Sequence, residues 1–165
     1  ERVIAVDRAE AQLEQARRRA EDRGFGNVHF FHGELAGEAL TQLVAELNPD
    51  RWGADAVVAA RVLHHAPVPA QAVKSLAALA APREANYPGG AVLVLDYEPH
   101  DDAPLRERQA DLWPGFEREE LEQWAAQAGL TDIEAGSLPM RGNGTRTDRS
   151  LQWQWLSARR GKQRE

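Results

Sequence analysis

The feature that most constrains the fold of this chain is a regular alternation between short apolar runs and longer stretches with helical periodicity. Short apolar runs are typical of strands buried on both faces of a parallel sheet, and apolar residues spaced three and four apart are typical of amphipathic helices. Strands that alternate with helices in this way indicate an α/β fold, in which a parallel sheet carries helices on both faces.

The pattern also predicts where each element lies. The expected strands cover residues 2–7, 27–32, 55–60, 91–95, 130–135 and 151–156. The expected helices cover about residues 9–22, 39–47, 68–81 and 117–128, and the polar stretch between residues 98 and 116 is expected to be a loop. Because no linker or low-complexity tract interrupts the pattern, we predict one domain over residues 1–157 and a disordered basic tail over residues 158–165.

The composition excludes several kinds of site. The chain has no cysteine, which rules out disulfides, thiolate metal sites and cysteine nucleophiles. A net charge of −6 disfavours binding to phosphate backbones.

No apolar run is long enough to span a membrane and no signal peptide opens the sequence, so we expect a soluble cytoplasmic protein with no membrane partner. Met140 is the only methionine and the chain opens in an apolar run, so we expect it to be part of a longer protein.

Polar and small residues stand at the carboxyl ends of the expected strands, where sheets of this kind bind their ligands. The first strand ends in Asp7, whose carboxylate can accept both hydroxyls of a ribose or can instead cap the following helix. The second strand leads into Gly33 and Glu34. The glycine lets a flat ring approach the backbone and the acid can accept a hydrogen from an exocyclic amine; the alternative is a turn glycine beside a solvated acid.

The third strand leads into Ala60, Arg61 and the pair His64 and His65. Small residues at a strand end leave room for a ligand, and histidines there can accept a proton or donate a hydrogen bond. Adjacent histidines on a strand or loop point apart, and no nearby carboxylate spacing completes a ligand set. We therefore expect no metal site, and favour a structural or substrate-lining role for the histidines.

Successive segments of the chain resemble, in order, the motifs of class I S-adenosylmethionine-dependent methyltransferases: VIAVDRAEAQLEQARRRA, NVHFFHGEL, ADAVVAARVLHHAPVPAQAVKSLAALAAP and PGGAVLVLDY. Within that family the chain is similar to methyltransferase type 11 domains, especially the bacterial group often fused behind an arsenic-repressor-type winged helix. That group carries an acidic loop and a W-x-GF element, matched here by residues 98–102 and 112–116. The resemblance implies a Rossmann-like methyltransferase sheet, S-adenosylmethionine as cofactor and an upstream winged-helix DNA-binding domain in the parent chain.

The same resemblance implies the residues that bind the cofactor. Asp7 would bind the ribose hydroxyls, and Arg8 would lie beside the adenine. Gly33–Leu35 would frame the adenine and its amine, and Ala60–Arg61 would line the sulfonium end.

On the acceptor side, the resemblance implies that His64 and His65 face the acceptor as the catalytic residues. Tyr97, His100 and Trp113 would form the walls of the substrate pocket. Aromatic faces suit such a place because they attract cations, including a sulfonium.

The family's first strand and its Asp-x-Gly-x-Gly-x-Gly loop have no counterpart in the chain, which resembles an N-terminally truncated domain. In the family's order that strand lies between the strands of residues 2–7 and 55–60, so its absence leaves central backbone groups unpaired. We expect this chain alone to be poorly stable or inactive unless another segment fills the gap. Strong hydrogen-exchange protection of Val3–Val6 would contradict this expectation.

The expected reaction is methyl transfer to a small-molecule acceptor, in which the protein mainly aligns the donor with the acceptor. Arsenite is disfavoured as acceptor because the related enzymes rely on cysteines. One alternative is a non-catalytic methyltransferase-like module for sensing or oligomerisation, attached to a transcriptional regulator. Another is a nicotinamide-dependent oxidoreductase, since an acid at a strand end also serves that fold. The sequence is compatible with a homodimer.

Overall fold

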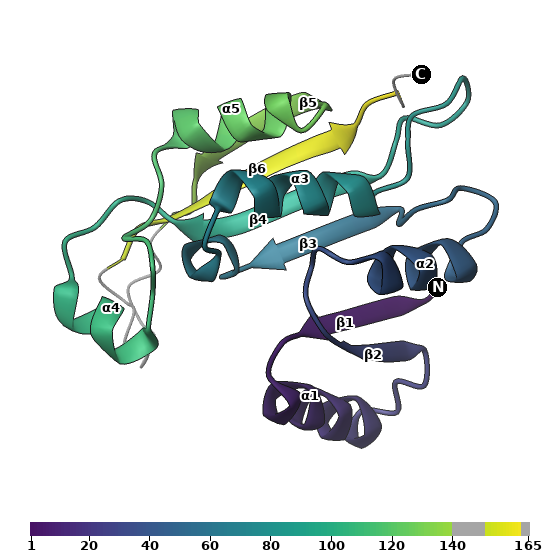
Figure 1. Cartoon of the computed structure of the whole chain (residues 1–165), viewed down its shortest axis with the longest axis horizontal. Coiled ribbons are helices and arrows are strands. Elements are labelled where there is room, and N and C mark those ends of the chain that lie inside the picture. Colours follow the sequence, from purple (N-terminus) through teal and green to yellow (C-terminus); the bar gives the residue numbers. More distant parts are fainter. Residues whose placement is uncertain (140–150, 163–165) are drawn as a thin grey trace. The chain divides into compact units, whose positions relative to one another are not determined.

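The structure is a computed structural model that describes residues 1–139 and 151–162. The chain divides into two compact units, Glu1–Gly53 and Ala54–Glu165, where the sequence suggested one domain. Each unit is built on its own set of strands (Figure 1). The Gly/Arg/Thr-rich loop expected between the last two strands falls on residues 140–150 and lies outside the described residues.

The first unit is a two-stranded parallel sheet with two helices. Its elements are β1 (Val3–Asp7), α1 (Glu10–Asp22), β2 (Val28–His32) and α2 (Glu38–Leu47). Val3 lies opposite Val28 and Asp7 lies opposite His32, so the two strands end together. The expected elements of this part of the chain are confirmed to within a residue or so at each end.

The second unit is a four-stranded mixed sheet with the strand order β3-β4-β6-β5. Its elements are β3 (Ala56–Ala60), the short 3₁₀ helix η1 (Leu63–His65), α3 (Pro69–Leu79), β4 (Ala91–Tyr97), α4 (Ala103–Gln109), α5 (Arg118–Gln127), β5 (Leu130–Ser137) and β6 (Trp153–Arg160). β3 and β4 are parallel, whereas β6 runs antiparallel to both β4 and β5. The α/β class is confirmed, but the expectation of an all-parallel sheet is wrong for the closing strands.

The core of the second unit lies between its sheet and the helices α3 and α5, which pack against each other (Figure 1). The buried side chains come from alternate positions of the strands and from one stripe of each helix: Val92, Val94, Leu156, Ala158, Val73, Leu76, Leu121 and Ala125. Burial of a whole leucine or valine side chain contributes about 1.5–3 kcal/mol. This packing holds the ends of β3 and β4 in fixed register.

One edge of β1 and one edge of β3 have no strand neighbour in the described part of the chain. The Val3 amide donates to the Asn27 carbonyl, and backbone groups alternate in direction along a strand, so the amides of Ile4 and Val6 point away from β2. On β3, Val58 is 63% exposed although the strand is wholly apolar. The expectation that such edges lower the stability of the chain stays a prediction.

The polar segment expected to be a loop contains α4. Asp102 precedes the helix, and its Oδ1 accepts a hydrogen bond from the Leu105 amide at 2.9 Å. Leu105 is the buried side chain of this helix, so one apolar side chain and a cap hold the helix in place. The apolar stripe that reveals a longer amphipathic helix is absent.

The strand β6 continues to Arg160, which corrects the boundary of the expected disordered tail. Arg159 pairs with Ala91 and Arg160 pairs with Leu130 across the sheet. Their guanidinium groups donate to the carbonyls of Gly89 and Ala128, each at 3.2 Å. Basic composition suggested a tail, but these side chains satisfy backbone carbonyls at the end of the sheet. Residues 163–165 lie outside the described part.

Candidate active site

In the first unit, the parallel pairing of β1 with β2 brings the carboxyl ends of the two strands to one edge. Asp7 Oδ1 accepts a hydrogen bond from the Ala9 amide at 2.8 Å, and the Gly33 amide donates to the Asp7 carbonyl at 3.1 Å. Arg8 and Glu34 form an exposed ion pair with 3.9 Å between Nη1 and Oε1, which contributes little to stability. The structure therefore brings these predicted cofactor residues together, with Leu35 directly after them.

The carboxylate of Asp7 closes the turn into α1, as the capping alternative predicted in part. The helix itself begins at Glu10, and its N-cap residue, Ala9, makes no side-chain hydrogen bond. The bond to the Ala9 amide occupies one oxygen and fixes the direction of the carboxylate. The other oxygen, Oδ2, accepts no hydrogen bond from the described residues, so it is able to accept one from a ligand hydroxyl.

In the second unit, β3 ends at Ala60 and the chain turns sharply at Arg61. Arg61 has φ of 61°, a left-handed conformation that costs a non-glycine residue about 1–2 kcal/mol. Its amide donates to the Leu95 carbonyl at 2.9 Å, its guanidinium contacts the Gln109 side chain on α4, and it lies 5.8 Å from the ring centre of Tyr97. Strained residues of this kind are concentrated at functional sites.

A buried histidine–carboxylate pair lies just beyond this turn. His64 and Asp96 are both fully buried, with 2.6 Å between Nδ1 and Oδ1. The Asp96 carboxylate also accepts hydrogen bonds from the Leu63 amide at 3.1 Å and the Tyr97 amide at 2.9 Å. Asp96 therefore fixes the orientation of the His64 ring. The sequence offered a signal for it, since Asp96 is an acid inside the apolar run of β4.

His65 and Asp111 complete a cluster with this pair. Asp111 Oδ1 lies 3.7 Å from His64 Nε2 and 3.5 Å from His65 Nδ1, and the two imidazole centres are 4.3 Å apart. The side chain of His65 is 35% exposed, whereas that of Asp111 is fully buried. Asp111 is held here because the next amide, that of Leu112, donates to the His64 carbonyl at 2.9 Å. Nothing near Asp111 in the sequence indicated this contact.

The environment of His65 favours its neutral form. Partial burial, followed by the neighbouring His64, lowers the pKa of His65 below the usual value for histidine, and Asp111 opposes that shift. A neutral imidazole carries a lone pair with which it can accept a proton or bind a metal.

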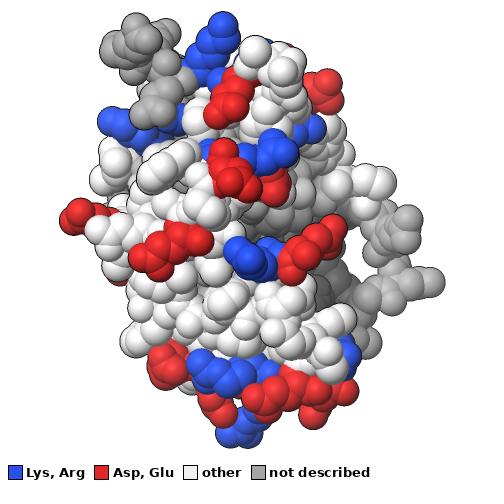
Figure 2. Space-filling model, turned by 90° about the vertical axis from the view of Figure 1, so that its right-hand side faces the viewer, with Lys and Arg blue, Asp and Glu red and all other residues white. Residues whose placement is uncertain are grey.

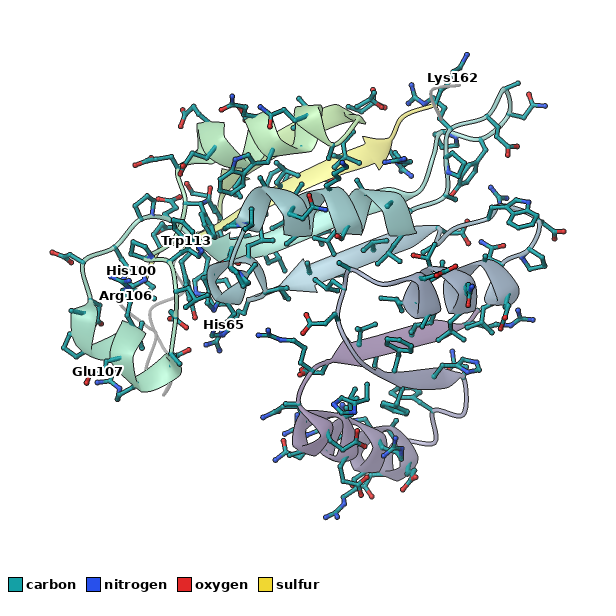
Figure 3. The ribbon with its side chains drawn as sticks, viewed as in Figure 1. His65, His100, Arg106, Glu107, Trp113 and Lys162 are labelled. Atoms are coloured by element: carbon teal, nitrogen blue, oxygen red, sulfur yellow. The ribbon has the colours of Figure 1, made fainter. Side chains whose placement is uncertain are left out.

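The predicted pocket-wall residues lie at the same end of this unit, although not all at the surface. Tyr97 is fully buried, stacked on His64 at 4.9 Å and edge-on to Trp153 at 4.7 Å. His100 and Trp113 lie on the segments before and after α4 (Figure 3), and the Trp113 indole donates to the Ala66 carbonyl at 2.8 Å. Trp113 is 40% exposed, and its amide donates to the His64 carbonyl. Their roles as walls of a substrate pocket stay predictions.

Two surface features bear on the choice of ligand. A shallow hollow next to Asp111 is lined by Ala103, Arg106, Glu107, Ala110, Asp111 and Leu112. On the face drawn in Figure 2, acidic and basic side chains are interspersed in small groups, and no broad basic patch appears there. No helix among the described residues is long and apolar enough to cross a membrane.

Comparison with known proteins gives a family match and a set of structural neighbours. A family model described as a methyltransferase domain matches residues 1–84. No curated protein matches the chain. Among solved structures, a proposed methyltransferase from Bacillus halodurans C-125 has a TM-score of 0.68 at 15% identity, covering 98% of this chain and 84% of its own.

Two further neighbours have similar scores. The YcgJ protein from Bacillus subtilis has a TM-score of 0.66 at 16% identity, covering 98% of this chain and 83% of its own. The [4+2]-cyclase SpnF has a TM-score of 0.67 at 15% identity, covering 98% of this chain and 67% of its own. At these identities the similarity shows a shared Rossmann-like fold.

Proposed function

Because the chain belongs to the methyltransferase domain family, we propose that it uses S-adenosylmethionine to methylate a small-molecule acceptor. One observation carries the proposal: the matched stretch, residues 1–84, contains every residue that we assign to the cofactor. These residues fall at the carboxyl ends of β1, β2 and β3, where α/β sheets bind their ligands.

The residues of the first unit suit the nucleoside part of the cofactor: the oriented carboxylate of Asp7 would bind the ribose hydroxyls, and Arg8 and Gly33–Leu35 would surround the adenine. Ala60 and Arg61 belong to the second unit, and their assignment to the sulfonium end rests on the family resemblance. The small side chain of Ala60 is exposed and leaves room for a ligand at the end of β3. When bound, the cofactor supplies an activated methyl group.

On the acceptor side, we assign proton removal to His65. Its ring is partly exposed and its pKa is lowered, so it is neutral and able to accept the acceptor's proton. His65 would take up the proton that the acceptor loses as it gains the methyl group. His64, which the sequence predicted as a second catalytic residue, is buried and bound to Asp96. We therefore assign to His64 the role of positioning His65.

A non-catalytic role is the second candidate, since the fold similarity to a protein named as a cyclase indicates that this fold is not restricted to methyl transfer. A chain with this fold can keep a ligand-binding edge and serve another purpose. In this alternative, the chain senses a ligand or forms a homodimer, and it follows a winged-helix DNA-binding domain in the parent protein.

Calorimetric titration of S-adenosylhomocysteine into the parent protein tests the proposal. We expect micromolar binding, about −8 kcal/mol, that is lost in Asp7→Ala. Asp22→Ala is the matched control, an exposed acid at the end of α1, and should bind like the unaltered protein. Failure of the unaltered parent protein to bind would refute the cofactor assignment and with it the methyltransferase proposal.

A further inference from the structure

We propose that His64, His65 and Asp111 form a binding site for a divalent transition-metal ion such as Zn²⁺. The three side chains offer two imidazole nitrogens and one carboxylate oxygen, and these atoms all lie within 4.8 Å of one another. The site goes beyond methyl transfer and does not depend on it. The sequence predicted no metal here, because the carboxylate comes from a distant segment.

The distances fit a shared ion better than direct hydrogen bonds. Asp111 Oδ1 is 3.7 Å from His64 Nε2 and 3.5 Å from His65 Nδ1. Hydrogen bonds between such atoms usually measure about 2.7–3.2 Å. A tetrahedral ion with bonds of about 2.0–2.2 Å holds its ligand atoms about 3.4 Å apart.

Several polar atoms of the three side chains are buried and lack a hydrogen-bond partner among the described residues. His64 Nε2 and both carboxylate oxygens of Asp111 have no hydrogen-bond partner among the described residues. An unpaired buried carboxylate is costly, and buried polar atoms in native proteins nearly always have a partner. A cation placed between the three side chains would satisfy these atoms together.

Asp96 prepares His64 to be a ligand. Nδ1 of His64 is 2.6 Å from Asp96 Oδ1, and the carboxylate is itself held by the amides of Leu63 and Tyr97. When Nδ1–H donates to Asp96, the lone pair of His64 is on Nε2 and faces Asp111. A carboxylate that orients a metal-binding histidine through its other nitrogen is the common arrangement at zinc sites.

The local backbone brings the two histidines and the acid together. The histidines lie on the 3₁₀ helix η1, where successive side chains turn by about 120° instead of pointing to opposite sides as in a strand. Asp111 follows Ala110, which has φ of 54°, and the Asp111 amide donates to the Arg106 carbonyl at 3.0 Å. His65 is the most exposed member of the cluster, with 35% of its side chain exposed, so an ion would enter on its side.

The ligand set indicates the class of ion. Two imidazoles and one carboxylate, without thiolates, suit zinc and other divalent transition metals. Three protein ligands leave a position open for water or an oxygen of a substrate, as at catalytic zinc sites. With the ion bound, His65 is a ligand and its lone pair is not available to a substrate proton. The metal-bound and metal-free sites therefore differ in their chemistry.

The test is a calorimetric titration of Zn²⁺ into the full chain after removal of metals with EDTA and dialysis. We expect one Zn²⁺ per chain, and visible absorption bands when Co²⁺ is used instead. Asp111→Asn and His65→Gln should each weaken Zn²⁺ binding by at least about tenfold, and Asp96→Asn by about 10–100-fold. The matched controls are His29→Gln and Glu107→Gln, exposed residues of the same types, which should bind as before.

Two results would overturn the proposal: no Zn²⁺ binding by the full chain, or binding that persists unchanged when His65→Gln and Asp111→Asn are combined. The second would assign the metal to surface histidines. Circular dichroism of each variant checks folding, and His65→Gln, at a partly exposed position, remains informative if a buried variant unfolds. Zn²⁺ is titrated without cofactor, so the result is independent of the Asp7 test.

Discussion

Removal of the Asp96 carboxylate is the most informative change to the second unit. Asp96 is fully buried and accepts hydrogen bonds from two backbone amides and from His64. Asp96→Ala leaves all three donors without their acceptor in the core. Asp96→Asn keeps an oxygen that can accept from the amides and an NH₂ group that can donate to His64 Nδ1.

The expected loss follows from these contacts. Each of the three buried donors left unpaired costs about 1–3 kcal/mol. Because water entering the vacated space offsets part of this cost, we expect Asp96→Ala to lower the free energy of unfolding by about 4 kcal/mol. At about 2–4 °C per kcal/mol for a chain of this size, the Tm falls by about 8–16 °C. Asp96→Asn should cost about 1–2 kcal/mol.

Urea unfolding followed by tryptophan fluorescence measures these losses, since Trp153 lies beside Tyr97 next to the site. The midpoint should fall while the slope with urea stays the same. Asp101→Ala is the control, an exposed acid in the following loop, and should change the free energy by less than about 0.5 kcal/mol. If Asp96→Ala unfolds at the same urea concentration as the control, the buried pair does not exist as described.

Three further predictions concern other parts of the structure. Gly115→Ala should destabilise the chain by about 2 kcal/mol or more, since φ is 91° there and a Cβ would lie 2.3 Å from the Glu98 carbonyl oxygen; an unchanged urea midpoint would contradict this. Hydrogen exchange should be faster at the Ile4 and Val6 amides, which face the free edge of β1, than at Val3 and Ala5; equal protection would show that another segment pairs with that edge. In EDTA, NMR titration should give His65 a pKa below the usual value, and Asp111→Asn should lower it further. The unfolded state then binds the proton more tightly than the folded state. The stability that His65 contributes is therefore complete above the pKa that His65 has in the unfolded state, and it is lost as the pH falls through the pKa in the folded state. A raised pKa in the folded state would refute the partial burial of His65.

Local periodicity was enough to predict most of the fold. The apolar runs of β1 to β4 and the stripes of α1, α2, α3 and α5 identify these elements because each buries one continuous set of side chains. The direction of β6 could not be read in this way, since alternation is the same in parallel and antiparallel strands. The helix α4 was missed because Leu105 alone gives it a buried side chain.

The candidate site was predictable only where it follows the strand ends. Asp7 ends β1 and Gly33 directly follows β2, so the topology of the first unit alone brings them to one edge. Asp111 comes from a distant polar segment, and its place depends on backbone hydrogen bonds to His64 that no sequence pattern encodes. The two histidines were expected to point apart, as in a strand, because nothing in the sequence indicated the 3₁₀ turn of η1.

The position of β6 determines when the second unit can form during synthesis. β6 lies between β4 and β5 and is the last strand of the described chain to leave the ribosome. Until then β5 has no partner, since its ladder pairs it with β6 alone among the described strands. The nascent unit therefore carries one open edge of β4, whose other edge pairs with β3, and the unpaired strand β5. Both are prone to association with other chains. Chaperone binding to stalled nascent chains should accordingly end once residues 153–160 have emerged.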